Sequence, residues 1–217
     1  MLQAPSPVLV AQSVGGFELS GELDHPAWNK ARVVHLETGW DGQAQPDVST
    51  EVRFLWEPQY FYAGFRCSYR DLNIDTTPPL DCYRWGLWDY DIVELHLSSE
   101  TLGISSYREL EAAPTGHWMD LDVVFARDKP FYDWEWRSGF EVRAAIREDI
   151  RTWTVEMKIP VRSVAERPLE TGTVWSINVY RADGKGEARK YLALMPTYTE
   201  RPNYHVPSRF GRIKFLK

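Results

Sequence analysis

The sequence predicts an all-β fold, an antiparallel β-sandwich of two packed sheets, jelly-roll or immunoglobulin-like, with long aromatic-rich loops. Apolar and polar residues alternate in roughly ten short segments, turn-forming residues separate these segments, and helical periodicity is almost absent. Ten tryptophans fit such a fold, because aromatic rings pack well on pleated surfaces. The length of 217 residues and the even composition predict one domain over residues 1–217.

The boundaries of the alternating runs give the expected strands. The clearest pair is Thr50–Trp56 and Tyr60–Cys67, which only the three residues Glu57 to Gln59 separate, a spacing typical of a β-hairpin. In chain order, the other expected strands are Arg32–Leu36, Asp91–Leu97, Ser106–Ala112, Trp118–Val124, Phe140–Ile146, Thr152–Ile159, Val174–Arg181, Lys190–Leu194 and Arg209–Leu216. Short helical turns are expected at Pro26–Lys30 and Val161–Val164.

The aromatic residues fall into two groups. Four tryptophans lie within alternating runs or where the chain approaches a strand, and we expect them to be buried: Trp28, Trp56, Trp153 and Trp175. Other aromatic residues gather in three stretches without a regular pattern, Asp71–Trp88, Ala126–Gly139 and Pro196–Ser208. These stretches are longer than hairpin turns require. Because long loops on a rigid sheet usually hold the binding residues, we expect the site there.

Charge and composition exclude several classes of protein. The net charge of −6 disfavours nucleic-acid binding, which needs clustered Lys and Arg. No apolar run reaches the roughly 20 residues of a membrane-spanning helix, so membrane insertion is not expected. The N-terminal residues lack the basic and apolar regions of a signal peptide. Cys67 and Cys82 could form one disulfide, but buried thiols are favoured because Cys67 lies in an expected strand.

The motifs of common catalytic sites are missing. The sequence contains no HExxH, no CxxC pair, no phosphate-binding glycine loop and no GxSxG, so we expect no catalytic zinc site of the ordinary kind. The run from Asp183 to Gly186 is interpreted as a hairpin turn. Two carboxylate pairs at a spacing of two residues are Glu109 with Glu111 and Asp120 with Asp122. A solvated strand face is the favoured interpretation, and a pair of glycosidase carboxylates is the alternative.

The segment LWDYDIVELHL places Trp88 just before a strand and Glu94 within it. If Val93 and Leu95 point into the core, Glu94 points to the outer face of the same sheet. An aromatic ring beside a carboxylate suits a sugar, which offers an apolar C–H face for stacking and hydroxyls for hydrogen bonds. The competing interpretation is structural: Trp88 covers a sheet edge and Glu94 pairs with an arginine such as Arg181.

Six segments in order resemble the family 9 carbohydrate-binding modules and the wider family-9-like, DOMON-related group. They are FELSGELDHPAW (17–28), STEVRFLWEPQYFYAGFRC (49–67), LWDYDIVELHL (87–97), WTVEMKIP (153–160), VWSINVYR (174–181) and PSRFGRIKF (207–215). The resemblance implies a β-sandwich and a noncatalytic module that holds a terminal sugar between two aromatic side chains. It also implies that structural calcium is possible, and a location that is extracellular or periplasmic.

The resemblance also implies site residues. The first aromatic residue of the family's clamp falls on Trp88 and the hydroxyl-binding carboxylate on Glu94. The second aromatic, a tryptophan in the sugar-binding members, falls on Tyr204, with His205 beside it as a substitute. Polar residues on the neighbouring strand fall near Glu109 and Glu111, where this chain lacks the Arg or Gln of the family pattern. The expected ligand-binding set is Trp88, Glu94, Glu111, Arg181, Tyr204 and His205, with no catalytic residue assigned.

Three alternatives remain open. A haem-binding relative on the same sandwich would need axial ligands, for which the candidates are Met119, Met195, His117 and His205. A small carbohydrate-active enzyme would use Asp or Glu residues on this scaffold. A sandwich that mediates protein contacts without a small ligand is the third alternative, because fold alone does not decide function.

Overall fold

The computed structural model describes residues 8–103, 105–126 and 129–217. Within these ranges the chain forms strands and short 3-10 helices, and no α-helix. The strands are β1 (Val8–Ser13), β2 (Val34–Leu36), β3 (Thr50–Glu57), β4 (Tyr60–Ser68), β5 (Ile92–Ser98), β6 (Ser106–Ala112), β7 (Trp118–Ala126), β8 (Lys129–Asp133), β9 (Glu141–Arg147), β10 (Thr152–Pro160), β11 (Val174–Asp183), β12 (Lys190–Ala193) and β13 (Gly211–Leu216). The 3-10 helices are η1 (Pro26–Lys30), η2 (Pro46–Val48), η3 (Leu87–Asp89), η4 (Glu148–Ile150), η5 (Val161–Ser163), η6 (Gly186–Ala188) and η7 (Pro207–Arg209).

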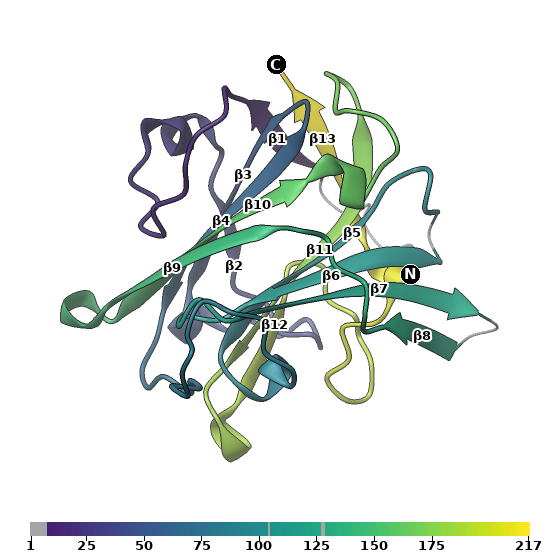
Figure 1. Ribbon diagram of the computed structural model, residues 1–217. Helices are drawn as coiled ribbons and strands as arrows, with labels where there is room; N and C mark the ends of the chain where they lie inside the picture. The colour runs from purple at the N-terminus through teal and green to yellow at the C-terminus, as the bar shows by residue number, and fades with distance from the viewer. Residues whose placement is uncertain (1–7, 104, 127–128) are drawn as a thin grey trace.

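The strands form one strongly curled sheet in the order β8-β7-β6-β5-β11-β13-β1-β3-β4-β10-β9, with β12 paired to β11 and β2 to β3 (Figure 1). The curl brings the half β8-β7-β6-β5-β11 over the half β3-β4-β10-β9, which gives the sandwich that the sequence predicts. The pairing is antiparallel except at β1, which lies parallel to both β13 and β3 and joins the two halves.

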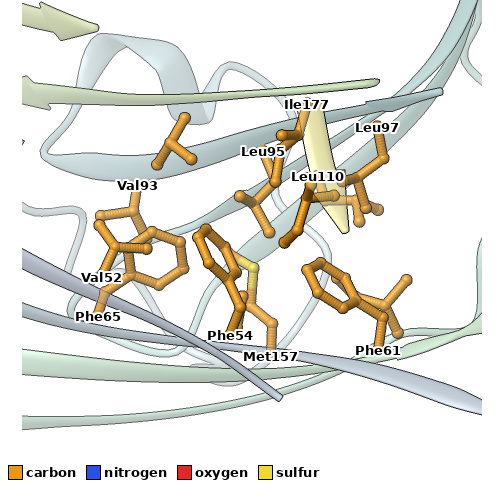
Figure 2. Close-up of a cluster of buried hydrophobic side chains, with 14 of the residues drawn as sticks. Val52, Phe54, Phe61, Phe65, Val93, Leu95, Leu97, Leu110, Met157 and Ile177 are labelled. Atoms are coloured by element: carbon orange, nitrogen blue, oxygen red, sulfur yellow. The ribbon is translucent and has the colours of Figure 1, made fainter. Parts of the chain in front are cut away.

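The main core lies between the two halves. Val52, Phe54 and Phe65 approach Val93 and Leu95 from the opposite layer (Figure 2). These residues sit at every second position of their strands, since alternate side chains point to one face. Trp28, Trp56, Trp153 and Trp175 are all buried, as expected. Three of them belong to this core, and Trp28 packs in a smaller cluster on an outer face.

The strands expected from the sequence all form, with boundaries shifted by one or two residues. Two further strands, β1 and β8, were not expected. Strand β1 contains the run VLVA, which is apolar without alternation, a pattern common in strands with parallel partners, as β1 has on both sides. Strand β8 contains Pro130, which lacks a backbone donor and is found mainly on edge strands; β8 is indeed an edge strand. Cys67 and Cys82 are free thiols, and Cys67 is buried.

Both outer faces of the sandwich are covered. A small apolar cluster around Phe17 and Trp28 packs on the half that contains β4 and β10. Another, around Leu87, Tyr107 and Met119, packs on the half that contains β5, β6 and β7. The expectation of solvated carboxylate pairs is therefore wrong for Glu109 and Glu111, which are buried on this second outer face.

The other expected pair, Asp120 and Asp122, lies on the opposite face of its sheet. Asp120 is buried and accepts hydrogen bonds from the backbone N–H and the hydroxyl of Ser138, while Asp122 pairs with Arg108. Among the described residues, no helix is long and apolar enough to cross a membrane.

Candidate functional site

A cavity of about 520 Å³ opens on the outer face of β5 and β6. Its lining comes from the stretch before β5 (Asn73, Trp88, Asp89), from β5 and β6 (Ile92, Glu94, Glu109, Glu111), from the β11–β12 hairpin (Ala182, Lys185, Gly186, Arg189, Tyr191) and from the loop before β13 (Pro202, Asn203, Tyr204, His205). Two of the three long loops expected to hold the site therefore line one cavity. Its volume lies within the range of small-molecule sites, roughly 300–1,000 Å³.

The floor of the cavity is acidic and buried. Strands β5 and β6 pair so that Glu94 lies opposite Glu111 and His96 opposite Glu109, which places all four side chains on one face. All four are buried, and His96 Nε2 is hydrogen-bonded to Glu94 Oε1. His96 also lies 3.5 Å from Glu109 Oε2 and stacks on the ring of Tyr107.

Burial controls the charge of this floor. It raises the pKa of Glu94, and it raises the pKa values of Glu109 and Glu111, with the neighbouring carboxylates adding to the effect. It lowers the pKa of His96 to about 4 and that of His205 to about 3. A low-dielectric site disfavours charge of either sign, so the acids tend to hold protons and the imidazoles tend to lose them. The floor is thus a set of nearly neutral hydrogen-bonding groups at neutral pH.

Aromatic side chains stand above this floor. Trp88 lies on η3 with 38% of its surface exposed, and its position follows directly from the short turn Leu87–Asp89 that ends the first long loop. Tyr204 stacks on Tyr180 of β11, with ring centroids 4.1 Å apart, and its hydroxyl donates a hydrogen bond to the Arg181 carbonyl. Tyr204 is therefore held firmly in place, while Trp88 is free on one side.

An exposed aromatic cluster extends outward from Trp88. Trp85 has 52% of its surface exposed and contacts both Trp88 and Trp134 edge to face. The ring centroids lie 5.1 Å apart in the first pair and 4.1 Å apart in the second. Trp134 comes from the second long loop, and it contacts Tyr132, which in turn lies 5.2 Å from the His205 ring. All three expected loops thus meet at this end of the molecule.

The hairpin between β11 and β12 supplies residues that motif analysis did not select. The interpretation of Asp183 to Gly186 as a turn agrees with the structure, but Lys185 and Gly186 also line the cavity. The Arg189 guanidinium donates to the backbone carbonyls of Trp88, Asp89 and Tyr90 and so anchors the turn that presents Trp88. Sequence spacing gave no signal for this role, because the two segments are about a hundred residues apart.

Five of the six expected ligand-binding residues line the cavity: Trp88, Glu94, Glu111, Tyr204 and His205. Arg181 does not. It points to the opposite face of β11, where it hydrogen-bonds to Thr50 and pairs with Asp183. The expected alternative of a Glu94–Arg181 pair does not form either, since the two side chains lie on opposite faces of the sheet.

The haem-ligand candidates are dispersed. Met195 packs in the main core, and Met119 packs in the cluster on the outer face of β5–β7. His117 is buried and hydrogen-bonded to Thr115 and to the carbonyl of Pro79. Of the four candidates, only His205 lines the cavity.

Comparison with known proteins identifies relatives over almost the whole chain. The family model described as "carbohydrate family 9 binding domain-like" matches residues 19–217. Endo-1,4-beta-xylanase A of Thermotoga maritima is 20% identical over 199 residues, which cover 92% of this chain and 17% of that enzyme. The chain thus spans about a sixth of the length of this curated relative.

Solved structures share the fold. A putative carbohydrate-binding protein from Bacteroides uniformis superposes with a TM-score of 0.74 and 18% identity, covering 96% of this chain and 98% of the other. A family 9 carbohydrate-binding module from Caldicellulosiruptor kristjanssonii in complex with cellotriose gives 0.68 and 16%, covering 97% and 94%. The corresponding complex with glucose gives 0.63 and 17%, covering 96% and 95%.

Proposed function

Because the chain belongs to the carbohydrate family 9 binding domain-like family, we propose that it is a noncatalytic module that binds a terminal sugar residue in the cavity above β5 and β6. The observation that supports this most directly is the convergence of Trp88 and Tyr204, which are more than a hundred residues apart in the sequence, on one cavity with a polar floor. In the proposed complex the sugar ring packs against these aromatic walls.

In the proposed complex the floor and the rim of the cavity bind the hydroxyl groups of the sugar. Glu94 and Glu111 offer carboxyl oxygens, and Asn203 on the rim offers an amide. Glu111 Oε2 has no hydrogen-bond partner within the protein other than the Glu109 carboxyl group, so a sugar hydroxyl can donate to a free lone pair of this oxygen. Gaining a bond at a buried, unsatisfied acceptor is favourable, because such an atom has already lost its water.

The ligand class follows from the relatives. Two solved structures with the same fold bind glucose and cellotriose, so we propose a glucose unit at the end of a β-linked glucan as the first ligand to test. The xylanase relative is much longer than this chain, which supports a role beside a polysaccharide-degrading activity. The extracellular or periplasmic location implied by the family resemblance is part of the same proposal.

The test is a calorimetric titration of the 217-residue chain with glucose and cellotriose. Stacking contributes about 0.5–1.5 kcal/mol beyond the burial of area, and the lost burial of apolar area adds to it, so Trp88→Ala should lose roughly ten- to a hundred-fold in affinity. Phe131→Ala is the matched control, since this aromatic residue is also exposed but does not line the cavity. Equal affinity of Trp88→Ala and the unaltered chain would refute the proposal.

A hydrolytic alternative is tested in the same samples. Incubation of the protein with the oligosaccharide, followed by chromatography, would reveal cleavage. Release of glucose in proportion to protein concentration would favour the carbohydrate-active enzyme over the binding module.

A further inference from the structure

The floor of the cavity contains more than a sugar site requires. His96 of β5, Glu109 of β6 and His205 of the last long loop each offer one ligand-type atom, and these atoms lie within 4.8 Å of one another. Glu109 Oε2 is 3.5 Å from His96 Nε2 and 3.6 Å from His205 Nδ1. Glu94 and Glu111 form a second such group with Glu109. The two groups share Glu109.

The cluster is not satisfied by the protein itself. Glu109 Oε2 and Glu111 Oε2 have no hydrogen-bond partner other than each other's carboxyl group, although their residues are only 3% and 2% exposed and both line the cavity. Buried polar atoms are almost always paired, and an unpaired one costs about 1–3 kcal/mol. A carboxyl pair that is buried at a cavity and has no other partner in the protein keeps lone pairs that an occupant of the cavity can use.

The chemistry of the group selects the kind of occupant. Two imidazoles with carboxylates suit zinc and similar transition ions, whereas calcium takes six to eight oxygen ligands. Tetrahedral zinc with bonds of 2.0–2.1 Å holds its ligand atoms about 3.3 Å apart. The separations of 3.5 and 3.6 Å between Glu109 and the two histidines are close to this value.

We propose that the floor of the cavity binds one divalent transition-metal ion, such as Zn²⁺, through His96 Nε2, His205 Nδ1 and the Glu109 carboxylate. The fourth position faces the cavity, where Glu94, Glu111 or a ligand hydroxyl can fill it. Glu94 is hydrogen-bonded to His96 Nε2, and the Tyr107 hydroxyl lies 2.7 Å from His205 Nδ1. Metal uptake replaces both of these hydrogen bonds.

This site escapes motif analysis because its ligands are not local in sequence. His96 and Glu109 are adjacent only through the pairing of β5 with β6, and His205 comes from a loop about a hundred residues later. The absence of HExxH and CxxC excludes the common helical and knuckle-type zinc sites and says nothing about ligands gathered across strands.

The test uses the full chain, stripped with EDTA and then dialysed against Zn²⁺, with bound metal measured by elemental analysis. One equivalent should be retained, and Co²⁺ in its place should give visible absorption bands typical of nitrogen and oxygen ligands. Glu109→Gln and His205→Gln should each weaken metal binding ten-fold or more. Glu22→Gln and His35→Gln are the matched controls, because both residues are exposed and distant from the cluster.

Folding of each variant is checked by circular dichroism and thermal melting. His205 lies in a loop and is partly exposed, so His205→Gln tests the site even if Glu109→Gln does not fold. Metal retention that is equal in His205→Gln and the unaltered chain, or less than half an equivalent in the unaltered chain, would overturn the proposal. Glucose titration of the EDTA-treated protein separates the two proposals, since sugar binding without metal retention leaves the proposed function intact.

Discussion

Buried glutamates lie on both outer faces of the sandwich, and the two faces treat them differently. On the half that contains β10, Glu156 accepts hydrogen bonds from the backbone N–H groups of Ser20 and Gly21 and from the Trp28 indole, all at 2.6–2.7 Å. On the half that contains β5 and β6, Glu109 and Glu111 each keep one oxygen whose only partner in the protein is the other's carboxyl group. Burial is nearly complete in both places.

The difference separates a structural carboxylate from a binding one. Glu156 holds the segment around η1 against the outer face of the sheet, and its hydrogen bonds are to groups of the protein itself. Glu109 and Glu111 face a cavity, and the interactions that they lack are the ones that a ligand can supply. Burial alone does not distinguish the two roles, whereas hydrogen-bond satisfaction does.

The largest expected effect comes from Glu156→Gln. Two carboxylate oxygens serve three N–H donors, and an amide has only one acceptor oxygen, so at least one buried donor loses its partner. We expect a loss of about 2–4 kcal/mol in the free energy of unfolding, measured by urea denaturation. A loss below about 0.5 kcal/mol would show that the N-terminal segment is not held through Glu156.

The second expected effect is a loss of affinity for the proposed sugar. Glu94→Gln replaces a carboxyl group with an amide that has one acceptor oxygen, and the proposed sugar should then bind about ten-fold more weakly, which is about 1.4 kcal/mol. Stacking on Trp88 remains, so Glu94→Gln together with Trp88→Ala should lose roughly the product of the two single losses. Unchanged glucose affinity in Glu94→Gln would place the hydroxyl contacts elsewhere in the cavity.

The sequence predicted part of what the structure shows on the outer face of β5 and β6. Alternation located β5 and β6 and placed Glu94 on the face away from the core, because side-chain direction in a strand depends only on parity. It could not show that loops cover that face, since the cover comes from Trp88 and Tyr204, more than a hundred residues apart. A polar outer face in a sequence is the same pattern whether water or a loop lies on it.

Arg181 also shows that sequence spacing does not reveal tertiary contacts. It belongs to the expected ligand-binding set, yet it points into the interior, where Thr50, Asp183 and three backbone carbonyls surround its guanidinium. Only tertiary contacts can supply such a set of acceptors, so sequence spacing gives no sign of it. Parity would have separated Arg181 from Glu94, because the two stand on opposite faces of the paired strands β11 and β5.

The smallest expected effect comes from Glu111→Gln. This substitution makes the same chemical change as Glu156→Gln on the other outer face, and it is therefore the most direct test of the comparison. Burial and the neighbouring carboxylates raise the pKa of Glu111 well above its ordinary value, which favours the neutral carboxyl group, and an amide of nearly equal shape resembles that neutral form. An amide can still hydrogen-bond to the Glu109 carboxyl group, and we expect the free energy of unfolding to change by less than about 1 kcal/mol in the metal-free protein. Urea denaturation beside Glu156→Gln measures both changes on one scale. If Glu111→Gln were as destabilising as Glu156→Gln, the floor of the cavity would be part of the structural framework, and its unpaired oxygens would no longer point to a ligand.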